Sequence, residues 1–353
     1  MAARFPRRMT AARRPASRRP RFTVVLPVHN GGRYLPECVD SILAQSYGDL
    51  ALEILENGST DGTAEWLGAV RDSRVRVRTA SRALPIELNW RRAAAVEKGE
   101  YLLFVGHDDR LDPDYLAIVD ELIRRCPDAA LFTTHFRLID ARGRVLRPCR
   151  PMPARETMAE LLASRLAYRR DMTGMGVVVR SSAYDAVGGM PAFEGLAHAD
   201  DVLWLGLLDG SWKATAPDEA YSYRLHAASA FHSLPWRPAV AAVERYAGFV
   251  ESLSETRGDV CEVWRRLGPA FLERRYRAIL LFALLGDGPR SGGFGASERE
   301  EVLASLDRLS PEAGRRLRRH AWLRVGSWAQ TAPMGAPLLA CWRAYWRSRR
   351  PWR

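Results

Sequence analysis

The first 230 residues alternate short apolar runs with polar, glycine-containing breaks and amphipathic segments. Four apolar runs have the length and composition of buried strands, at 22–26, 52–55, 75–78 and 101–105. Helical spacing of apolar residues predicts three helices between or beside them, at 34–45, 64–70 and 86–98. This β-α-β-α-β-α-β order predicts an α/β fold with a doubly wound, mostly parallel sheet.

The same patterns continue to about residue 230 and then change. Further strands are predicted at 131–139, 177–180, 214–216 and 220–225, and further helices at 158–168, at 181–187 and directly after residue 200. From residue 238 onward the pattern is helical, rich in arginine and tryptophan, with no further strand. We therefore expect a sheet domain over 22–232, a helical, basic C-terminal region over 233–353, and a disordered basic arm over 1–21.

Charge separates the two ends of the chain from its middle. Residues 1–21 contain eight arginines and residues 313–353 contain ten, and neither segment contains an acid. Without these eighteen arginines the formal net charge would be −6 rather than +12. Basic ends suit a polyanionic surface, either anionic lipid or nucleic acid, and the alternative is solvated tails.

The segment 338–353 alternates tryptophan and leucine with arginine, which fits an amphipathic helix in a membrane interface as well as a helical cap on the sheet domain. No apolar stretch reaches the roughly 20 residues of a spanning helix. Five cysteines without a CxxC spacing indicate a reducing compartment. We expect a cytoplasmic protein, peripheral on the inner face of the cell membrane through its basic C-terminus, without a specific nucleic-acid partner.

Three predicted strands end in unusual polar clusters: PVHN at 27–30, ENGSTDGT at 56–63 and GHDD at 106–109. The carboxyl ends of parallel strands meet at one edge of a sheet, where ligands bind. Asp108 and Asp109 are hard oxygen ligands that suit Mg²⁺ or Mn²⁺ carrying phosphates, and taken alone they fit a solvated turn before a helix equally well. The convergence of the three clusters favours the metal site. The chain shows neither a Walker lysine nor a GxGxxG motif.

A second acidic pair, Asp200 and Asp201, begins a predicted helix in the stretch HADDVLWLGL. One carboxylate at a helix N-terminus is explained by capping, and the second exceeds what capping needs. His226 follows the predicted strand 220–225 and, taken alone, would be an ordinary structural or exposed histidine.

These blocks together resemble the family 2 glycosyltransferases of GT-A fold. The resemblance rests on PVHNGGRYLPECVDSILAQSY, ENGSTDGT, NWRRAAAVEKGEYLLFVGHDD, ADDVLWLGL and YSYRLH, and it covers roughly residues 22–232. It implies an inverting, metal-dependent enzyme that moves a sugar from a nucleoside-diphosphate sugar to the hydroxyl of a saccharide, lipid-linked or small-molecule acceptor. Cell-surface polysaccharide, glycolipid or natural-product glycoside synthesis would be its setting.

The resemblance also implies roles for single residues. The first-strand nucleotide loop corresponds to Pro27, Val28, His29 and Asn30, with His29 near the base. Glu56 and Asn57 stand where the family usually has aspartates, the second of which reads the base, so the identity of the base stays open. In the DXD-type motif, Asp108 would face the ribose and Asp109 would hold Mn²⁺ or Mg²⁺, which His226 can help to bind.

For the proton transfer, the resemblance implies that Asp200 is the catalytic base, judged by its spacing from Trp204 in the sequence. Asp201 is the alternative. Two other classes compete with this function. A nucleotidyltransferase would normally carry a glycine-rich, lysine-bearing loop after the first strand, which is absent here. A degenerate GT-A module that binds without catalysis is the other alternative, and the departures at Asn57 and Ala199 favour it.

Overall fold

The computed structural model describes residues 19–171, 173–226, 234–285, 294–320 and 323. The chain divides into two compact units, of which the first comprises residues 1–158, 170–192 and 203–225. The second comprises residues 159–169, 193–202 and 226–353. The expected boundary near residue 232 stays a prediction.

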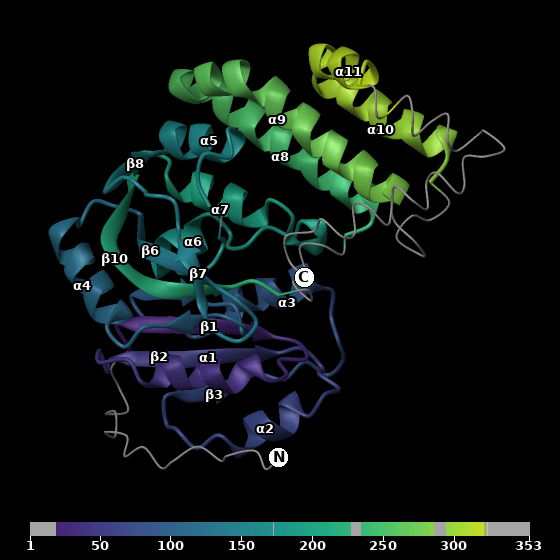
Figure 1. Cartoon of the computed structure of the whole chain (residues 1–353). Coiled ribbons are helices and arrows are strands. Elements are labelled where there is room, and N and C mark those ends of the chain that lie inside the picture. The colour runs from purple at the N-terminus through teal and green to yellow at the C-terminus, as the bar shows by residue number, and fades with distance from the viewer. Residues whose placement is uncertain (1–18, 172, 227–233, 286–293, 321–322, 324–353) are drawn as a thin grey trace. The chain divides into compact units, whose positions relative to one another are not determined.

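The first unit is built on one sheet (Figure 1). Its strands are β1 (Phe22–Val28), β2 (Leu50–Glu56), β3 (Val75–Val77), β4 (Tyr101–Phe104), β5 (Arg110–Leu111), β6 (Leu131–Ile139), β7 (Val145–Pro148), β8 (Arg155–Thr157), β9 (Val177–Arg180) and β10 (Trp212–Arg224). The strand order is β3-β2-β1-β4-β9-β6-β10-β5, with β7 beside β6 and β8 beside β10. Strands β3, β2, β1, β4, β6 and β10 run in one direction, while β9 runs antiparallel between β4 and β6.

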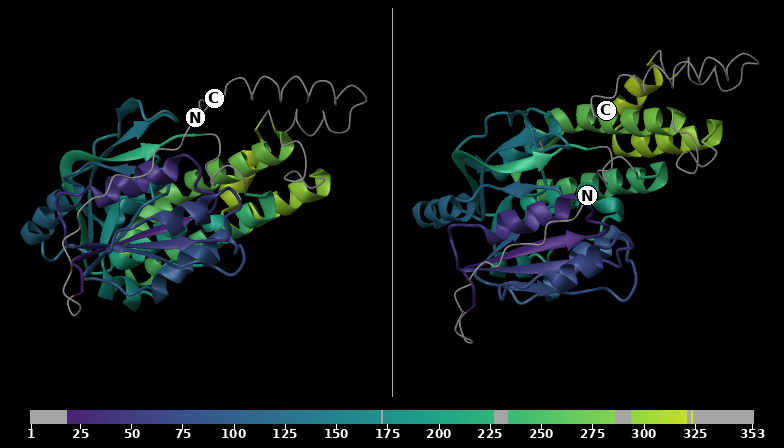
Figure 2. Two further views of the ribbon diagram at one scale, coloured as in Figure 1. Left: turned by 90° about the horizontal axis from the view of Figure 1, so that it is seen from below. Right: turned by 60° about the horizontal axis from the view of Figure 1, so that its bottom comes forward.

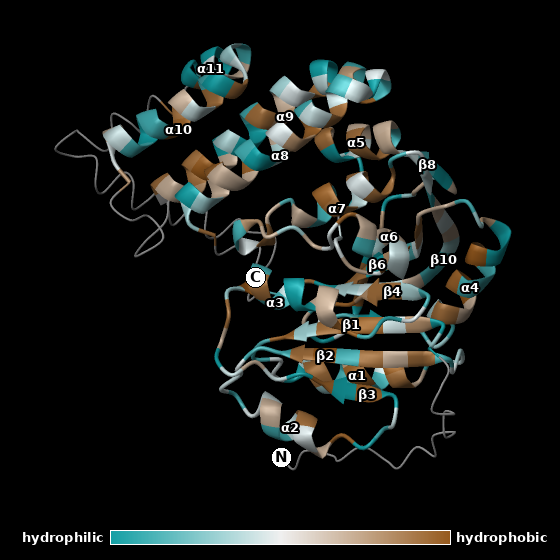
Figure 3. Ribbon diagram, turned by 180° about the vertical axis from the view of Figure 1, so that it is seen from behind, coloured by the Kyte–Doolittle hydropathy of each residue, from teal (hydrophilic) through white to brown (hydrophobic). Residues whose placement is uncertain are grey.

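The centre of this sheet is buried because its strands are almost continuously apolar. All seven residues of β1 and all seven of β2 are buried, and Figure 3 shows their apolar residues in brown. Phe22 and Leu26 of β1 are fully buried. Full burial of such a side chain contributes about 1.5–3 kcal/mol, so this pattern accounts for a rigid sheet centre from which the strand ends can present polar loops.

The four helices predicted at 34–45, 64–70, 86–98 and 181–187 are present in the first unit, together with one further helix that begins after residue 114. They are α1 (Tyr34–Leu43), α2 (Thr63–Ala69), α3 (Ile86–Arg91) with the 3-10 turn η1 (Arg92–Ala95), α4 (Tyr115–Arg125) and α6 (Ser181–Ala186). Two helices contain residues of both units: α5 (Met158–Leu166) and α7 (Ala199–Leu207). Helix α1 buries Leu35, Val39 and Ile42, which recur at helical spacing within the segment predicted as a helix.

Two expected elements differ from the structure. The helix expected over 86–98 changes to a 3-10 turn at Arg92 and ends at Ala95. The two strands expected at 214–216 and 220–225 form the single strand β10, whose register against β6 shifts between Ala216 and Glu219 and again before Tyr221. Such an irregularity interrupts the alternating pattern without ending the strand, which explains why the sequence suggested two.

Within the residues that the structure describes, four helices follow β10 in the second unit, which also contains the 3-10 turn η2 (Glu194–Leu196). They are α8 (Trp236–Thr256), α9 (Gly258–Leu285), α10 (Ala296–Leu309) and α11 (Pro311–Arg318). Helices α8 and α9 lie side by side, as the green ribbons of Figure 2 show. Among the described residues no strand follows Arg224, and no helix is long and apolar enough to cross a membrane. The basic arm up to residue 18 and the segment 338–353, for which membrane contact was expected, lie outside the described residues.

Candidate active site

The loops after β1 and β2 are joined by backbone-to-side-chain hydrogen bonds. The Asn30 N–H donates to Ser59 Oγ (2.9 Å), and the Thr60 N–H donates to Asn30 Oδ1 (2.8 Å). The Gly31 N–H donates to Thr63 Oγ1 (2.9 Å). Asn30 takes the left-handed backbone conformation (φ 50°), which asparagine tolerates better than most residues. Two of the three predicted strand-end clusters therefore form one structure.

The predicted nucleotide loop begins inside the sheet. Pro27 and Val28 are the last residues of β1, and both are buried. His29 is exposed, and its Nδ1 lies 3.0 Å from the carbonyl oxygen of Asn57 at the end of β2. Of the four predicted residues, the exposed His29 and Asn30 are thus the two whose side chains can reach a ligand.

Asn57 is held by the polypeptide itself. Its Nδ2 donates to the Leu84 carbonyl (2.9 Å), and its Oδ1 accepts the Leu84 N–H (2.9 Å). The side chain is 3% exposed. The base-reading role predicted for Asn57 would have to use the one amide proton or lone pair left after this pairing.

Unlike Asn57, Glu56 has a polar side-chain atom that forms no hydrogen bond. Its side chain is fully buried, its Oε1 accepts the Ser59 N–H (2.6 Å), and its Oε2 is buried without a hydrogen-bond partner. An unpartnered carboxylate oxygen in the interior is costly, so a donor that reached it would be bound favourably. The predicted base-reading residue was Asn57, but of these two residues Glu56 is the one with a polar side-chain atom that has no hydrogen-bond partner.

Asp109 is the most enclosed member of the acidic pair after β4. It is 1% exposed. Its Oδ1 accepts the backbone N–H of Arg224 (2.9 Å), and its Oδ2 accepts the hydroxyl proton of Tyr221. Burial, followed by the charge of Asp108, raises the pKa of Asp109 well above its usual range. Both oxygens of Asp109 therefore tie the turn after β4 to strand β10.

Asp108, by contrast, is partly exposed. The two carboxylates leave no room for a side chain at Gly106, because a Cβ there would lie 2.8 Å from both Asp108 Oδ1 and Asp109 Oδ2. The conformation of this acidic turn thus depends on a glycine two residues before the pair.

Replacing Gly106 by alanine is expected to lower stability by about 1–3 kcal/mol, because the new Cβ displaces the two carboxylates. The change can be measured by urea unfolding. Gly68→Ala in α2 is the matched control: no atom lies within 4 Å of its Cβ position, and alanine in a helix is expected to stabilise by about 0.5–1 kcal/mol. Equal stability of wild type and Gly106→Ala would contradict the close approach.

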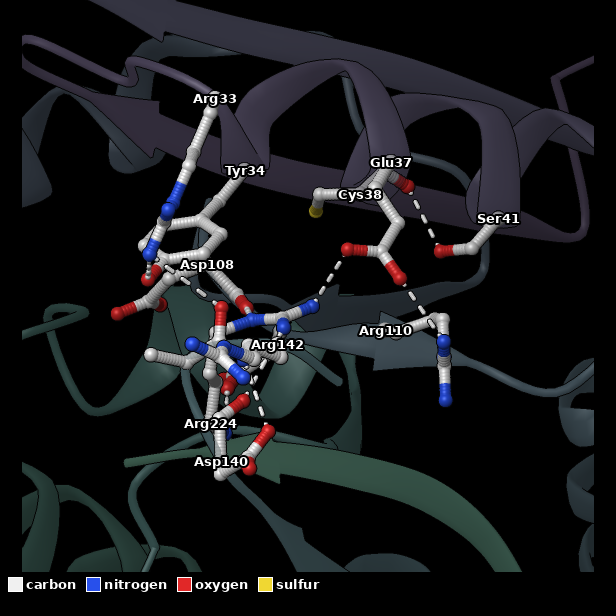
Figure 4. Close-up of polar contacts among 12 residues, drawn as sticks. Arg33, Tyr34, Glu37, Cys38, Ser41, Asp108, Arg110, Asp140, Arg142 and Arg224 are labelled. Atoms are coloured by element: carbon white, nitrogen blue, oxygen red, sulfur yellow. Dashed lines mark hydrogen bonds and ion pairs between the residues drawn. The ribbon is translucent and has the colours of Figure 1, made fainter. Parts of the chain in front are cut away.

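Arg224 organises this region, and the sequence analysis did not identify it. Its side chain is 2% exposed, its Nη2 pairs with Glu37 Oε2 (2.6 Å), and its Nε donates to the Asp108 carbonyl (2.7 Å). Its Nη1 donates to the Asp140 carbonyl (3.3 Å), and its guanidinium lies 4.7 Å from the ring centre of Tyr34. Figure 4 shows this arginine between α1 and the turn after β6. An arginine at the end of the apolar stretch AYSY was the signal that could have marked it.

These side chains determine whether a divalent cation fits the site. No group of three histidine, cysteine, aspartate or glutamate side chains that could hold a metal occurs within the described ranges. Asp109 already accepts two protein donors, whereas Asp108 offers a partly exposed carboxylate of the type that Mg²⁺ and Mn²⁺ prefer. His226 follows β10 by two residues, is partly exposed and belongs to the second unit. The residues of the first unit thus fit a metal through Asp108, and the assignment to Asp109 and His226 stays a prediction.

The second acidic pair lies in the second unit, in the first turn of α7. Asp201 is 4% exposed, and its Oδ1 lies 2.8 Å from Arg165 Nε while its Oδ2 lies 3.2 Å from His198 Nδ1. Burial opposes its ionisation, but Arg165 and His198 together hold the pKa of Asp201 below its usual value.

Asp200 is partly exposed, and in the described part of the chain no side chain forms a hydrogen bond or ion pair with it. Burial, followed by the negative charge of Asp201, raises the pKa of Asp200 to about 6. A carboxylate with that pKa can accept a proton near neutral pH. The structure therefore distinguishes the two candidates for the catalytic base, because Asp201 is paired and has a lowered pKa whereas Asp200 has a raised pKa.

Comparison with known proteins gives a family match over residues 23–182, to the model described as "Glycosyl transferase family 2". The O-antigen biosynthesis protein RfbC of Myxococcus xanthus is 32% identical over 212 residues, which are 58% of this chain and 16% of RfbC. Glycosyltransferase GlyG of Streptococcus pneumoniae is 37% identical over 90 residues, which are 25% of this chain and 30% of GlyG. The chain thus spans less than a third of the length of either relative.

Solved structures match over nearly the whole chain. Residues 1–349 of TarS from Staphylococcus aureus, in complex with UDP, superpose with a TM-score of 0.60 at 15% identity, covering 94% of this chain and 93% of that one. The mannosyltransferase PcManGT of Pyrobaculum calidifontis, in complex with GDP-Man and Mn²⁺, gives a TM-score of 0.50 at 16% identity, covering 97% and 91%. At these identities the likeness establishes the fold.

Proposed function

This chain contains a glycosyl transferase family 2 domain with a GT-A fold, and from that membership we propose that it transfers a sugar from a nucleoside-diphosphate sugar to an acceptor hydroxyl. One observation carries the proposal. The neighbouring parallel strands β2, β1 and β4 all end in polar loops at the same edge of the sheet. That edge is where ligands bind in α/β sheets of this type.

The donor's nucleoside would occupy the loops after β1 and β2. Exposed His29 and Asn30 would border the nucleoside, and Glu56 would accept an N–H of the base through its unpartnered Oε2. Structures of TarS contain UDP or UDP-GlcNAc, and the structure of PcManGT contains GDP-Man, which supports a nucleoside-diphosphate sugar without naming the base. Uracil and guanine both present ring N–H donors of the kind that Glu56 could bind.

The diphosphate would lie beside Asp108. A Mn²⁺ or Mg²⁺ ion held there would offset the charge that develops on the leaving diphosphate. Arg224 and Tyr221 would keep the turn in place through the Asp108 carbonyl and the Asp109 carboxylate. In this arrangement Asp109 supports the turn, and Asp108 is the residue in reach of the donor.

The acceptor hydroxyl must lose its proton as it attacks the sugar. We assign that proton to Asp200, because its raised pKa and its lack of a described side-chain partner suit a general base, whereas Asp201 is already paired. A single displacement assisted by one base would invert the anomeric centre.

The relatives named for O-antigen biosynthesis and hyaluronan synthesis support a saccharide acceptor in cell-surface polysaccharide synthesis. Contact of the basic C-terminus with an anionic membrane stays a prediction.

A thermal-shift panel of UDP-, GDP- and dTDP-sugars, each with and without Mn²⁺, tests the proposed function. A donor present at about a hundred times its dissociation constant is expected to add about 2.7 kcal/mol of stability. Stabilisation by one nucleotide class, stronger with Mn²⁺, would support a nucleotide-sugar transferase. No shift with any donor, followed by no release of nucleoside diphosphate in a coupled assay, would favour the binding-module alternative.

A further inference from the structure

The second unit contains a buried charged cluster that the proposed function does not explain. Arg165 at the end of α5, His198 before α7 and Asp201 in the first turn of α7 are each 8% exposed or less. A buried ion pair costs several kcal/mol in desolvation for each ion and is weak support for stability. The cluster therefore calls for a reason other than holding the helices together.

The geometry of the cluster fixes both oxygens of Asp201. Arg165 Nε lies 2.8 Å from Oδ1, close enough for an ion pair although the two atoms are not aligned as a hydrogen bond. His198 Nδ1 lies 3.2 Å from Oδ2, so its ring proton can be donated to the carboxylate. Neither oxygen of Asp201 is left to meet a substrate hydroxyl.

His198 is itself held under constraint. Its backbone is in the left-handed conformation (φ 64°), which costs free energy for a residue other than glycine. Its ring stacks on Tyr246 at 4.6 Å between ring centres and meets Phe271 edge-on at 5.7 Å. Residues are retained in such conformations when the surrounding structure requires them, and here the conformation directs the imidazole at Asp201.

We propose that Arg165 and His198 are positioning residues that hold Asp201 as a fixed, buried carboxylate, whose charge keeps the adjacent Asp200 ready to accept a proton. This inference rests on the proposed role of Asp200 as general base. Asp201 then acts through its neighbour and touches no substrate. Helix capping needs only one carboxylate in the first turn of α7, and the proposed positioning of Asp201 accounts for the second.

The charged groups around Asp200 and Asp201 determine the direction in which each substitution should change the pKa of these residues. Asp201 disfavours ionisation of Asp200, while Arg165 favours it. Arg165, His198 and Arg275 favour ionisation of Asp201, and the charges of both aspartates add to burial in raising the pKa of Tyr246. Removing the Asp201 charge should thus make Asp200 a weaker base, and removing the Arg165 charge should make the coupled pair hold its proton more tightly.

Carbon-13 NMR of the full-length protein labelled at aspartate carboxyls, titrated with acid, tests this without any substrate. The resonance that disappears in Asp200→Asn should titrate near pH 6 in the wild type. In Asp201→Asn it should move down by about one pH unit, and in Arg165→Gln the upper titration of the pair should move up by about one unit. Arg165→Lys should restore the wild-type value, because it restores the charge.

Opposite shifts in Asp201→Asn and Arg165→Gln cannot result from a purely structural role. Equal or same-direction shifts, or no titration near pH 6, would overturn the inference. If Arg165→Gln fails to fold because Asp201 is left unpaired, the pair Arg165→Met with Asp201→Asn removes both charges. The titration of Asp200 should then lie nearer to its wild-type position than in Asp201→Asn alone, because the effects of the two charges on its pKa oppose each other. Should all shifts appear while Asp200→Asn still transfers sugar, the charge arrangement stands and the proposed base is wrong.

Discussion

Replacing Asp200 by asparagine is expected to abolish sugar transfer while donor binding is kept. A positioned general base contributes about 10²–10⁴-fold to rate, and asparagine cannot accept the acceptor's proton. The variant should therefore lose that factor in kcat. Its thermal shift with the nucleotide sugar should match the wild type, since no donor contact is assigned to Asp200.

The pH profile gives the second part of this expectation. Because the pKa of Asp200 is raised to about 6, wild-type transfer should fall as the pH drops below 6, where the carboxylate takes up a proton. Transfer should reach a plateau above about pH 7. Asp218→Asn, a change at an exposed aspartate of β10, is the matched control and should leave rate and profile unchanged. Full activity of Asp200→Asn would remove this residue from the mechanism.

The central sheet could be predicted because its information is local. Burial on both faces makes strands such as β1 and β2 continuous apolar runs, and the glycine-bearing breaks after them mark the strand ends. The reversed direction of β9 could not be predicted. Its sequence, Val177–Arg180, is the same apolar run whichever way the strand points, and only its neighbours β4 and β6 determine the direction.

The candidate site was predictable in position but not in the roles of its residues. The sequence located Asp108 and Asp109 at one strand end, but it could not show that Asp109 is the carboxylate buried against strand β10. That depends on Tyr221 and Arg224, more than a hundred residues away. The same holds for Asp200 and Asp201, because the partner that distinguishes them, Arg165, comes from another helix. Side-chain pairing across the fold is set by tertiary contacts, which residue spacing does not encode.

Those contacts lead to opposite expectations for the first acidic pair. In Asp109→Asn, the amide oxygen can accept the Arg224 N–H while the NH₂ group donates to the Tyr221 oxygen, but the Tyr221 hydroxyl proton then loses its acceptor. A buried donor left unpaired costs about 1–3 kcal/mol, so this variant should unfold at lower urea concentration. Asp108→Asn changes a partly exposed side chain and should alter stability by less than about 0.5 kcal/mol.

In activity assays the order should be reversed, with the larger loss in Asp108→Asn. If Asp108 is the carboxylate that faces the metal and the diphosphate, Asp108→Asn should lose about 10²–10³-fold in kcat, the size expected when one stabilising group is removed from a developing charge. It should also need more Mn²⁺ for half-maximal donor stabilisation in the thermal-shift assay. Asp109→Asn, measured at a temperature where it is folded, should keep the wild-type Mn²⁺ requirement. A normal Mn²⁺ requirement in Asp108→Asn, with an altered one in Asp109→Asn, would return the metal to Asp109, as the sequence resemblance implied.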